Sequence, residues 1–291
     1  MPPDLDALLT HLYVSLDDSL PPRTGPGRLP STNDAEIICL AVSQALLNVP
    51  SDREFLRRAR LRLAHLFPVI PNQSGYLKRV RALATTISET VEWVSRRCGA
   101  ALDDVFLVDS TPLPCGASRE TTKRSDLAGY ASYGYCASHS RYFWGFRLHL
   151  VCDLDGVPVR WALTGAADPE RDTAEALLDP FLRAGVTVIA DKGYAGRHHE
   201  AFYREHGAVL LRPSRRNDEH LGIGSLGFIR QRIESVFDTA KGQLGLEQHG
   251  ARTLQSVHAR IAQRLLALAV AIWHNRINDH YPRRDLTTYA A

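Results

Sequence analysis

Two short apolar runs, each closed by an aspartate, constrain the fold of this chain more than any other feature. Val105 to Val108 is followed at once by Asp109, and Val186 to Ala190 by Asp191. Short, uninterrupted apolar runs are typical of strands buried on both faces of an α/β sheet. Because ligands bind beyond the carboxyl ends of such strands, we expect both carboxylates to face one crevice. Each aspartate also has a local interpretation, as the residue that begins the turn after its strand.

The segments around these runs predict an α/β domain over residues 101–291. Tyr142 to Val151 and Val157 to Leu163 have strand-like composition and flank Asp155-Gly156, a pair that favours a tight hairpin turn. The first apolar run is expected to end at the segment Ser110 to Pro112. Apolar periodicity predicts helices over 169–184, 198–206, 228–244 and 257–275, and a further strand over 208–211.

Residues 1–100 predict an all-helical region. Apolar residues recur at spacings of three and four from Leu5 to Leu12 and again from Ile37 to Ala41. A loop is expected from Pro21 to Pro30, and two further helices over 51–67 and 74–97. A separate helical region is therefore expected before the α/β domain.

Composition excludes several classes of protein. With 291 residues, 44% of them hydrophobic and 23% charged, the chain is of ordinary globular type and not intrinsically disordered. Its longest apolar stretch, Leu265 to Trp273, is shorter than the roughly 20 residues of a membrane-spanning helix, so no membrane is expected among its partners. The N-terminus has no export signal, and five scattered cysteines without a CxxC pair suit a reducing compartment. We expect a cytoplasmic protein.

A third acid, Glu234, lies in the helix predicted over 228–244. At about 100° per residue, Arg230, Glu234 and Lys241 fall within about 40° of one another on that helix. The alternative is an exposed, salt-bridged face, since Arg230 and Glu234 are an i,i+4 pair. Acids from three separate elements are what phosphodiester cleavage requires, because two divalent ions about 3.5–4 Å apart stabilise the attacking and leaving oxygens.

Four segments resemble, in order, the motifs of bacterial insertion-sequence DDE transposases. They are Leu107 to Pro112, Gly145 to Leu150, Ile189 to Tyr194, and Arg230 to Lys241. The resemblance covers roughly residues 105–275 and implies an RNase H-like mixed sheet flanked by helices. It also implies that the helical region over residues 1–100 binds DNA. It implies that Asp109, Asp191 and Glu234 bind two Mg²⁺ or Mn²⁺ ions, and that Arg230 and Lys241 contact DNA. Gly227 stands where the family has a tyrosine.

The resemblance implies an endonuclease and strand transferase that acts on double-stranded DNA. Its substrates would be the terminal inverted repeats of an insertion sequence and the target DNA, and it would work as a homodimer associated with the nucleoid. Two alternatives stay open, another RNase H-like nuclease such as a junction resolvase and a catalytically silent DNA-binding protein derived from a transposase. The order of the motifs favours a transposase, and the presence of all three acids argues against the silent protein.

Further DNA contacts are predicted from local charge. Arg57 and Arg58 belong to an arginine-rich stretch that can neutralise phosphates. Lys192 directly follows Asp191, while Arg147 and His149 share one face of their strand and could face the crevice. For the arginine-rich stretch and for the strand pair, the alternative is a solvated face.

Overall fold

The computed structural model describes residues 4–21, 30–136, 140–213 and 227–290, and of residues 227–230 the backbone alone. The chain forms two compact units. The first comprises residues 1–90, 240–251 and 255–291, and the second comprises residues 91–239 and 252–254. The chain therefore leaves a helical unit, builds an α/β unit and returns. These units describe packing, and the functional boundary near residue 100 stays a prediction.

The first unit is helical, as expected. Its helices are α1 (Leu5–Asp17), α2 (Asp34–Leu46), α3 (Asp52–Arg62), α4 (Gln73–Ala82), α10 (Leu254–Ile277) and the short α11 (Thr287–Ala290), while α5 (Ala84–Arg97) spans the division between the units. The helix expected over 74–97 is two helices, α4 and α5, and the one expected over 51–67 ends at Arg62. Most of the loop expected from Pro21 to Pro30 lies outside the described residues.

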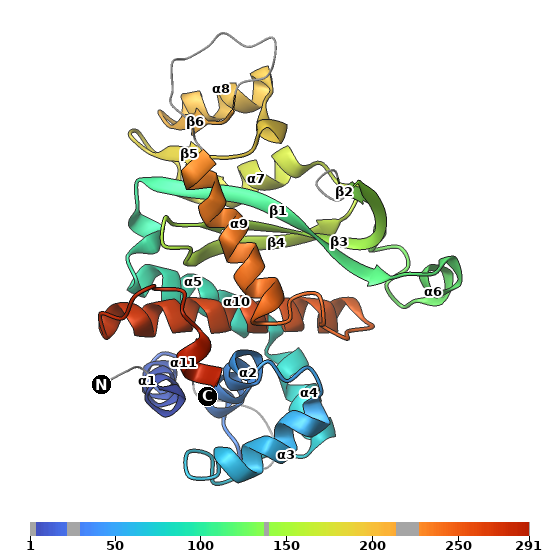
Figure 1. Ribbon diagram of the computed structural model, residues 1–291, viewed down its shortest axis with the longest axis vertical. Coiled ribbons are helices and arrows are strands. Elements are labelled where there is room, and N and C mark those ends of the chain that lie inside the picture. The colour runs from blue at the N-terminus through green and yellow to red at the C-terminus, as the bar shows by residue number, and fades with distance from the viewer. Residues whose placement is uncertain (1–3, 22–29, 137–139, 214–226, 291) are drawn as a thin grey trace. The chain divides into compact units, whose positions relative to one another are not determined.

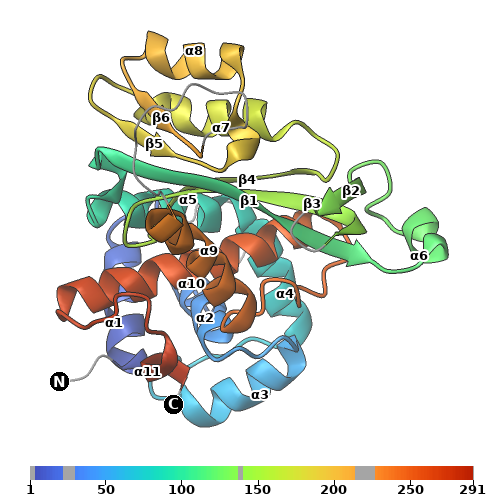
Figure 2. The same cartoon turned by 45° about the horizontal axis from the view of Figure 1, so that its top comes forward.

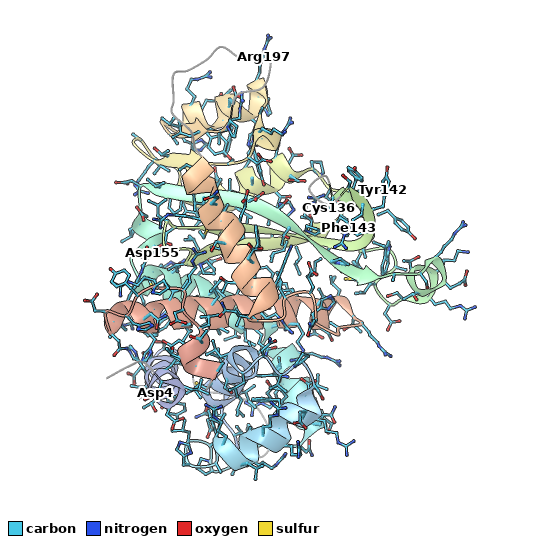
Figure 3. The ribbon with its side chains drawn as sticks, in the orientation of Figure 1. Asp4, Cys136, Tyr142, Phe143, Asp155 and Arg197 are labelled. Carbon is cyan, nitrogen blue, oxygen red and sulfur yellow. The ribbon has the colours of Figure 1, made fainter. Side chains whose placement is uncertain are left out.

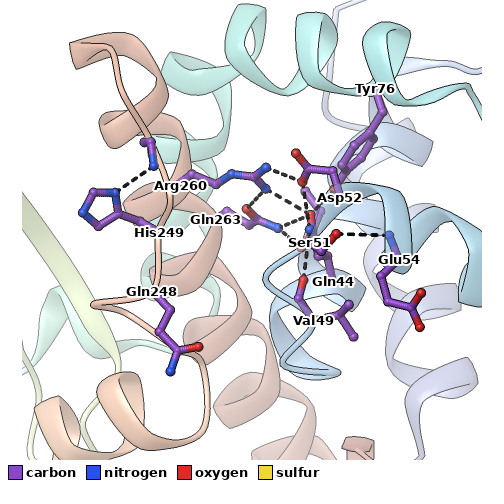
Figure 4. Close-up of polar contacts among 12 residues, drawn as sticks. Gln44, Val49, Ser51, Asp52, Glu54, Tyr76, Gln248, His249, Arg260 and Gln263 are labelled. Carbon is purple, nitrogen blue, oxygen red and sulfur yellow. Dashed lines mark hydrogen bonds and ion pairs between the residues drawn. The ribbon is translucent and has the colours of Figure 1, made fainter. Parts of the chain in front are cut away.

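A buried polar network joins four helices of the first unit (Figure 4). Arg260 of α10 pairs with Asp52 of α3 and donates to Oε1 of Gln44 on α2 at 3.1 Å. The same Gln44 oxygen accepts from the Tyr76 hydroxyl at 2.8 Å. Burial of these groups is tolerated because each finds a hydrogen-bond partner. Despite its apolar stretch, α10 is no membrane span: none of the helices in the described part of the chain is long and apolar enough to cross a bilayer.

The second unit is built on a mixed sheet (Figure 1). Its strands are β1 (Val105–Gly116), β2 (Ser132–Cys136), β3 (Arg141–Cys152), β4 (Pro158–Gly165), β5 (Thr187–Ile189) and β6 (Val209–Leu211). They lie in the order β2-β3-β1-β5-β6, and β4 also pairs with β3. The pairings of β3 are antiparallel, whereas β1, β5 and β6 are parallel. The expected RNase H-like mixed α/β class is confirmed.

Helices flank this sheet (Figures 1 and 2). They are α7 (Glu170–Leu178), which contacts β3 and β4, α8 (Arg197–Glu205), and α9 (Gly227–Gly242), which crosses the sheet at β1. A short helix, α6 (Arg119–Arg124), follows the far end of β1. The helix expected over 169–184 ends at Leu178, because Pro180 has no N–H to donate to the α-helical hydrogen-bond ladder. A 3-10 turn, Asp179–Phe181, follows.

Strand β1 is longer than the sequence indicates. It was expected to end at the Ser110 to Pro112 segment, but it continues to Gly116 by pairing with β3. Pro112 and Pro114 are tolerated because the described pairing of β1 with β5 stops at Leu107, so beyond it the missing N–H groups cost no hydrogen bond to a second neighbour. Close approach of β1 and β3 requires glycine at position 145, where an added Cβ would lie 2.2 Å from the Leu113 carbonyl oxygen.

The predicted hairpin between β3 and β4 is confirmed. Gly156 adopts a φ of +86°, which favours glycine, and the Asp153 side chain accepts a hydrogen bond from the Val157 N–H at 2.8 Å. The turn sets the register in which β4 pairs with β3.

Candidate active site

Asp109 and Asp191 lie at matching positions on parallel strands. Leu107 of β1 is paired with Ile189 of β5, the last pair in their register, and each aspartate stands two residues further on. Since side chains alternate along a strand, each aspartate points to the same face as the paired residue before it. Strand register therefore brings two carboxylates side by side where the parallel pairing ends.

Each aspartate also forms the local contact that the alternative interpretation expects. Oδ1 of Asp109 accepts a hydrogen bond from the Ser110 N–H at 2.8 Å, and Oδ1 of Asp191 accepts one from the Lys192 N–H at 2.6 Å. Asp191 is the N-cap of a 3-10 turn over Lys192–Tyr194. These bonds orient the carboxylates, so the structural and the chemical interpretations are compatible.

Glu234 completes a set of three acids around one small pocket. The pocket is lined by two strand ends and one turn of helix α9, through Leu107, Val108, Asp109, Ile189, Ala190, Asp191, Ile233 and Glu234. Asp109 and Asp191 are half-buried, while Glu234 is exposed. Ile233 is buried, and it anchors the turn of α9 that carries Glu234. The three acids that the sequence singles out thus meet from β1, β5 and α9.

The donor set suits a hard divalent cation, because carboxylate oxygens are the ligands that Mg²⁺ and Mn²⁺ prefer. The three acids do not form a preassembled coordination group. Within the described residues, no three His, Cys, Asp or Glu side chains lie close enough to hold an ion as they stand. Magnesium is usually held by one or two carboxylates with water and substrate phosphate, so a site that completes itself around DNA fits this arrangement.

Tyr194 is a site residue that sequence reasoning did not single out, although it ends the Asp-Lys-Gly-Tyr motif. Its side chain is 1% exposed, and among the described residues its hydroxyl has no hydrogen-bond partner. Burial raises the pKa of Tyr194 well above its usual value, and the negative charges of Asp109 and Glu170 raise it further. A neutral phenol therefore lies next to the acid pocket.

Arg147 is held beside the pocket by a second missed residue, Glu170, the first residue of α7. The Arg147 Nη1 atom lies 2.8 Å from Glu170 Oε1, and the Ser110 hydroxyl donates to Glu170 Oε2 at 3.0 Å. Arg147 does not line the acid pocket. The arginine and the serine next to Asp109 thus share one carboxylate from α7.

His149 lies on the same strand but is completely buried, so it belongs to no solvated face. Its Nε2 atom is 2.9 Å from the Thr164 hydroxyl oxygen of β4. Burial lowers the pKa of His149 to about 4, and the nearby positive charge of Arg147 lowers it in the same direction. His149 is accordingly neutral at pH 7 and does not line the acid pocket.

The remaining predicted DNA contacts are on the surface or outside the described side chains. Lys192 is exposed directly after Asp191. Lys241 is 3.5 Å from Glu247, and Arg57 and Arg58 are exposed around Glu54, at 2.8 and 2.7 Å. The backbone of Arg230 belongs to α9, but its side chain lies outside the described residues. The DNA-binding roles of these residues stay predictions.

Comparison with known proteins gives a family match. The model of the family described as "Transposase DDE domain" matches residues 100–270, which is more than half of the 291 residues. A solved structure, that of a piggyBac transposase synaptic complex with hairpin DNA, is similar over 97% of this chain and 75% of that chain, with 10% identity and a TM-score of 0.42. A search of curated proteins finds no match.

Proposed function

Because the chain belongs to the transposase DDE domain family, we propose that it cuts DNA at the ends of an insertion-sequence-like element and joins those ends to target DNA. One observation carries the proposal. The carboxylates of Asp109, Asp191 and Glu234, which are far apart in the sequence, line a single pocket. Three acids around one pocket suit the metal-dependent cleavage of a phosphodiester.

The proposed reaction has two balanced steps. Water attacks the phosphorus atom at the element end, the P–O bond to the 3′ oxygen breaks, and that oxygen leaves with a proton as a 3′-hydroxyl. The freed hydroxyl then attacks a phosphodiester of the target, forms a new P–O bond and displaces a target 3′-hydroxyl. Two Mg²⁺ or Mn²⁺ ions, when bound, would stabilise the charge on the attacking and leaving oxygens.

The residues around the pocket have distinct proposed roles. Asp109 and Asp191, oriented by their own backbone N–H groups, would hold the ions from the sheet. Glu234 would close the set from α9. Arg230, Lys241 and Lys192 would contact phosphates near the cut, as guanidinium and ammonium groups do. Arg57 and Arg58 would contribute phosphate contacts from α3, and Arg147 would contribute one beside the pocket. His149, which is completely buried, would not touch DNA. Because an element has two ends, a homodimer is proposed.

The natural substrate for a test is the DNA that flanks the coding region, which would contain the terminal inverted repeats. Purified protein with Mg²⁺ or Mn²⁺ should cut a labelled fragment of this DNA at the repeat boundary and leave a 3′-hydroxyl. Asp109→Ala should abolish cutting while end binding stays detectable, because the loss of one carboxylate removes a proposed metal ligand and none of the predicted phosphate contacts.

Asp238→Asn is the matched control, because Asp238 is exposed on α9 one turn beyond Glu234 and does not line the pocket. Its cutting should equal that of the unaltered protein. Cleavage by Asp109→Ala at the unaltered rate would contradict the assignment of that carboxylate. End binding without cutting by the unaltered protein would point to a silent, DNA-binding member of the family.

A further inference from the structure

Three exposed tyrosines form a continuous strip on the hairpin of β2 and β3. Tyr133 and Tyr135 alternate along β2, and Tyr135 is paired with Tyr142 of β3. Their side chains are 57%, 48% and 78% exposed, and the rings of Tyr135 and Tyr142 are 5.0 Å apart between centroids. Large aromatic rings that stay in water forgo the stabilisation that burial would give them, so an exposed cluster of such rings indicates a contact surface. We call these three residues the tyrosine strip.

The hairpin is two-faced, which shows that the exposure of the strip is not a general feature of this segment. On the opposite face, Cys136 and Phe143 are buried together with Ala166. Figure 3 shows Tyr142 at the outer side of the hairpin and Cys136 and Phe143 further in. One face of the hairpin therefore packs against the protein, and the other presents rings outward.

Helix α6 places positive charge next to the strip. The Thr122 hydroxyl oxygen lies 3.2 Å from that of Tyr133, and Trp144 and Thr121 are both near Gly116, so α6 is docked on the same face. Its three cations are Arg119, Lys123 and Arg124, against one acid, Glu120. Glu120 is 3.8 Å from both Lys123 and Arg124, in contacts between exposed side chains that contribute little to stability. The helix therefore presents a net positive charge beside the rings.

The strip and the acid pocket share one face of the sheet. Side chains alternate along β3, so Tyr142 and Leu150, which are eight residues apart, point the same way. Leu150 is the direct cross-strand partner of Asp109. At about 3.3 Å per residue, the strip lies roughly 26 Å from Asp109 along the strand. That is about eight steps of stacked DNA, so a substrate cut at the pocket is long enough to reach the strip.

From this placement we propose that the tyrosine strip and the α6 cations bind unpaired nucleotides of the DNA strand that leads away from the acid pocket. The inference rests on the proposed function and deepens it. The rings stack on exposed bases, and the cations neutralise the phosphates between them. This combination of rings and charge recognises single strands with little regard to sequence. Duplex DNA keeps its base faces stacked inside, so it offers the rings no comparable contact.

A second copy of this chain is the competing occupant of the surface, and the charge of α6 favours nucleic acid. Two identical surfaces would bring the cations of one copy near those of the other, whereas phosphates would neutralise them. If a second copy binds there, substitution of the tyrosines should weaken a dimer, which the test below measures.

The test measures binding by fluorescence anisotropy in the non-cutting Asp109→Ala background, with Mg²⁺ present. The two probes are the same element-end duplex, one blunt and one with a single-stranded extension of six thymidines. The Asp109→Ala protein, the parent of the other variants, should bind the extended probe about tenfold more tightly than the blunt probe, since stacking of a base has an effect of that size. The pair Tyr135→Ala and Tyr142→Ala should lose this preference and keep the affinity for the blunt probe. Phenylalanine at both positions should preserve it, because the rings remain.

Tyr281→Ala, at an exposed tyrosine distant in sequence, is the matched control and should leave the preference unchanged. An unchanged preference in the alanine pair would overturn the inference. The inference would also be overturned if light scattering without DNA showed that the alanine pair loses a dimer while its preference for the extended probe stays intact. The surface would then bind a second copy of the chain. Failure of the parent to bind either probe would instead count against the proposed function.

Discussion

A neutral, buried histidine next to a charged network makes the stability of the second unit depend on pH. His149 has its pKa lowered to about 4, from an ordinary value of 6.5. Between these values the unfolded chain takes up a proton that the folded chain does not, so the free energy of unfolding falls as the pH falls. This loss of unfolding free energy should be nearly absent at pH 7, reach about 2 kcal/mol at pH 5, and level off below pH 4.

Urea unfolding at pH 7 and pH 5 measures this effect. The matched variant is His149→Gln, which keeps a side-chain partner for Thr164 but cannot titrate. The unaltered protein should lose about 2 kcal/mol more than this variant between the two pH values. Equal losses would mean that His149 is protonated in the folded protein as readily as in the unfolded one.

At the same scale, the acids could be predicted from the sequence, but their surroundings could not. Asp109 and Asp191 stand out because a charge directly after a buried apolar run is unusual and needs a reason. Glu170 and Tyr194 carry no such signal. Glu170 is one more acid in the first turn of a helix, where acids are common, and Tyr194 only becomes notable once its hydroxyl is buried. Their positions follow from packing between elements that are distant in the chain.

At the scale of elements, the buried pair Arg260–Asp52 should be a strongly coupled contact between α10 and α3. The side chains are 10% and 11% exposed, so removing one partner leaves a buried charge without its counterion. Asp52→Asn alone and Arg260→Met alone should each cost about 3–5 kcal/mol. The double variant should cost clearly less than the sum, because neither charge is then left alone.

A double-mutant cycle of denaturant unfolding tests this coupling. The pair Glu54 and Arg57, on the same helix α3, is more exposed and is the matched control. Glu54→Gln should change stability little because water screens that pair. Additive effects at Asp52 and Arg260 would mean that Gln44 and Gln263 hold the guanidinium without the carboxylate.

Element types followed from local patterns, and element lengths depended on their neighbours. The hairpin of β3 and β4 was predictable because Asp155-Gly156 determines its turn. The extension of β1 to Gly116 was not, since Pro112 and Pro114 disfavour a strand unless one of its edges is open. Strand β2 and helix α6 were also missed. β2 owes its place to pairing with β3, and six residues are too few for helical periodicity to be recognised.

At the scale of the whole molecule, the order of elements along the chain is what assembles the site. The second unit is inserted between segments that belong to the first, and the last strand of its sheet is followed by α9, which carries Glu234. Four motifs in order predicted a DDE transposase, and the family match over residues 100–270 confirms that family. The origin in a bacterial insertion sequence stays a prediction. The grouping of α10 with the N-terminal helices was not predictable, since an apolar helix does not specify its partner.

Asp109, Asp191 and Glu234 are proposed to act as one divalent-metal centre for cutting DNA. The most direct measurement is the affinity for Mn²⁺, followed by electron paramagnetic resonance, of the protein bound to its element-end DNA. We expect Asp109→Asn, Asp191→Asn and Glu234→Gln each to weaken Mn²⁺ binding about tenfold or more, and Asp238→Asn to leave it unchanged. If all three variants bind Mn²⁺ as tightly as the unaltered protein, these acids do not form the metal centre.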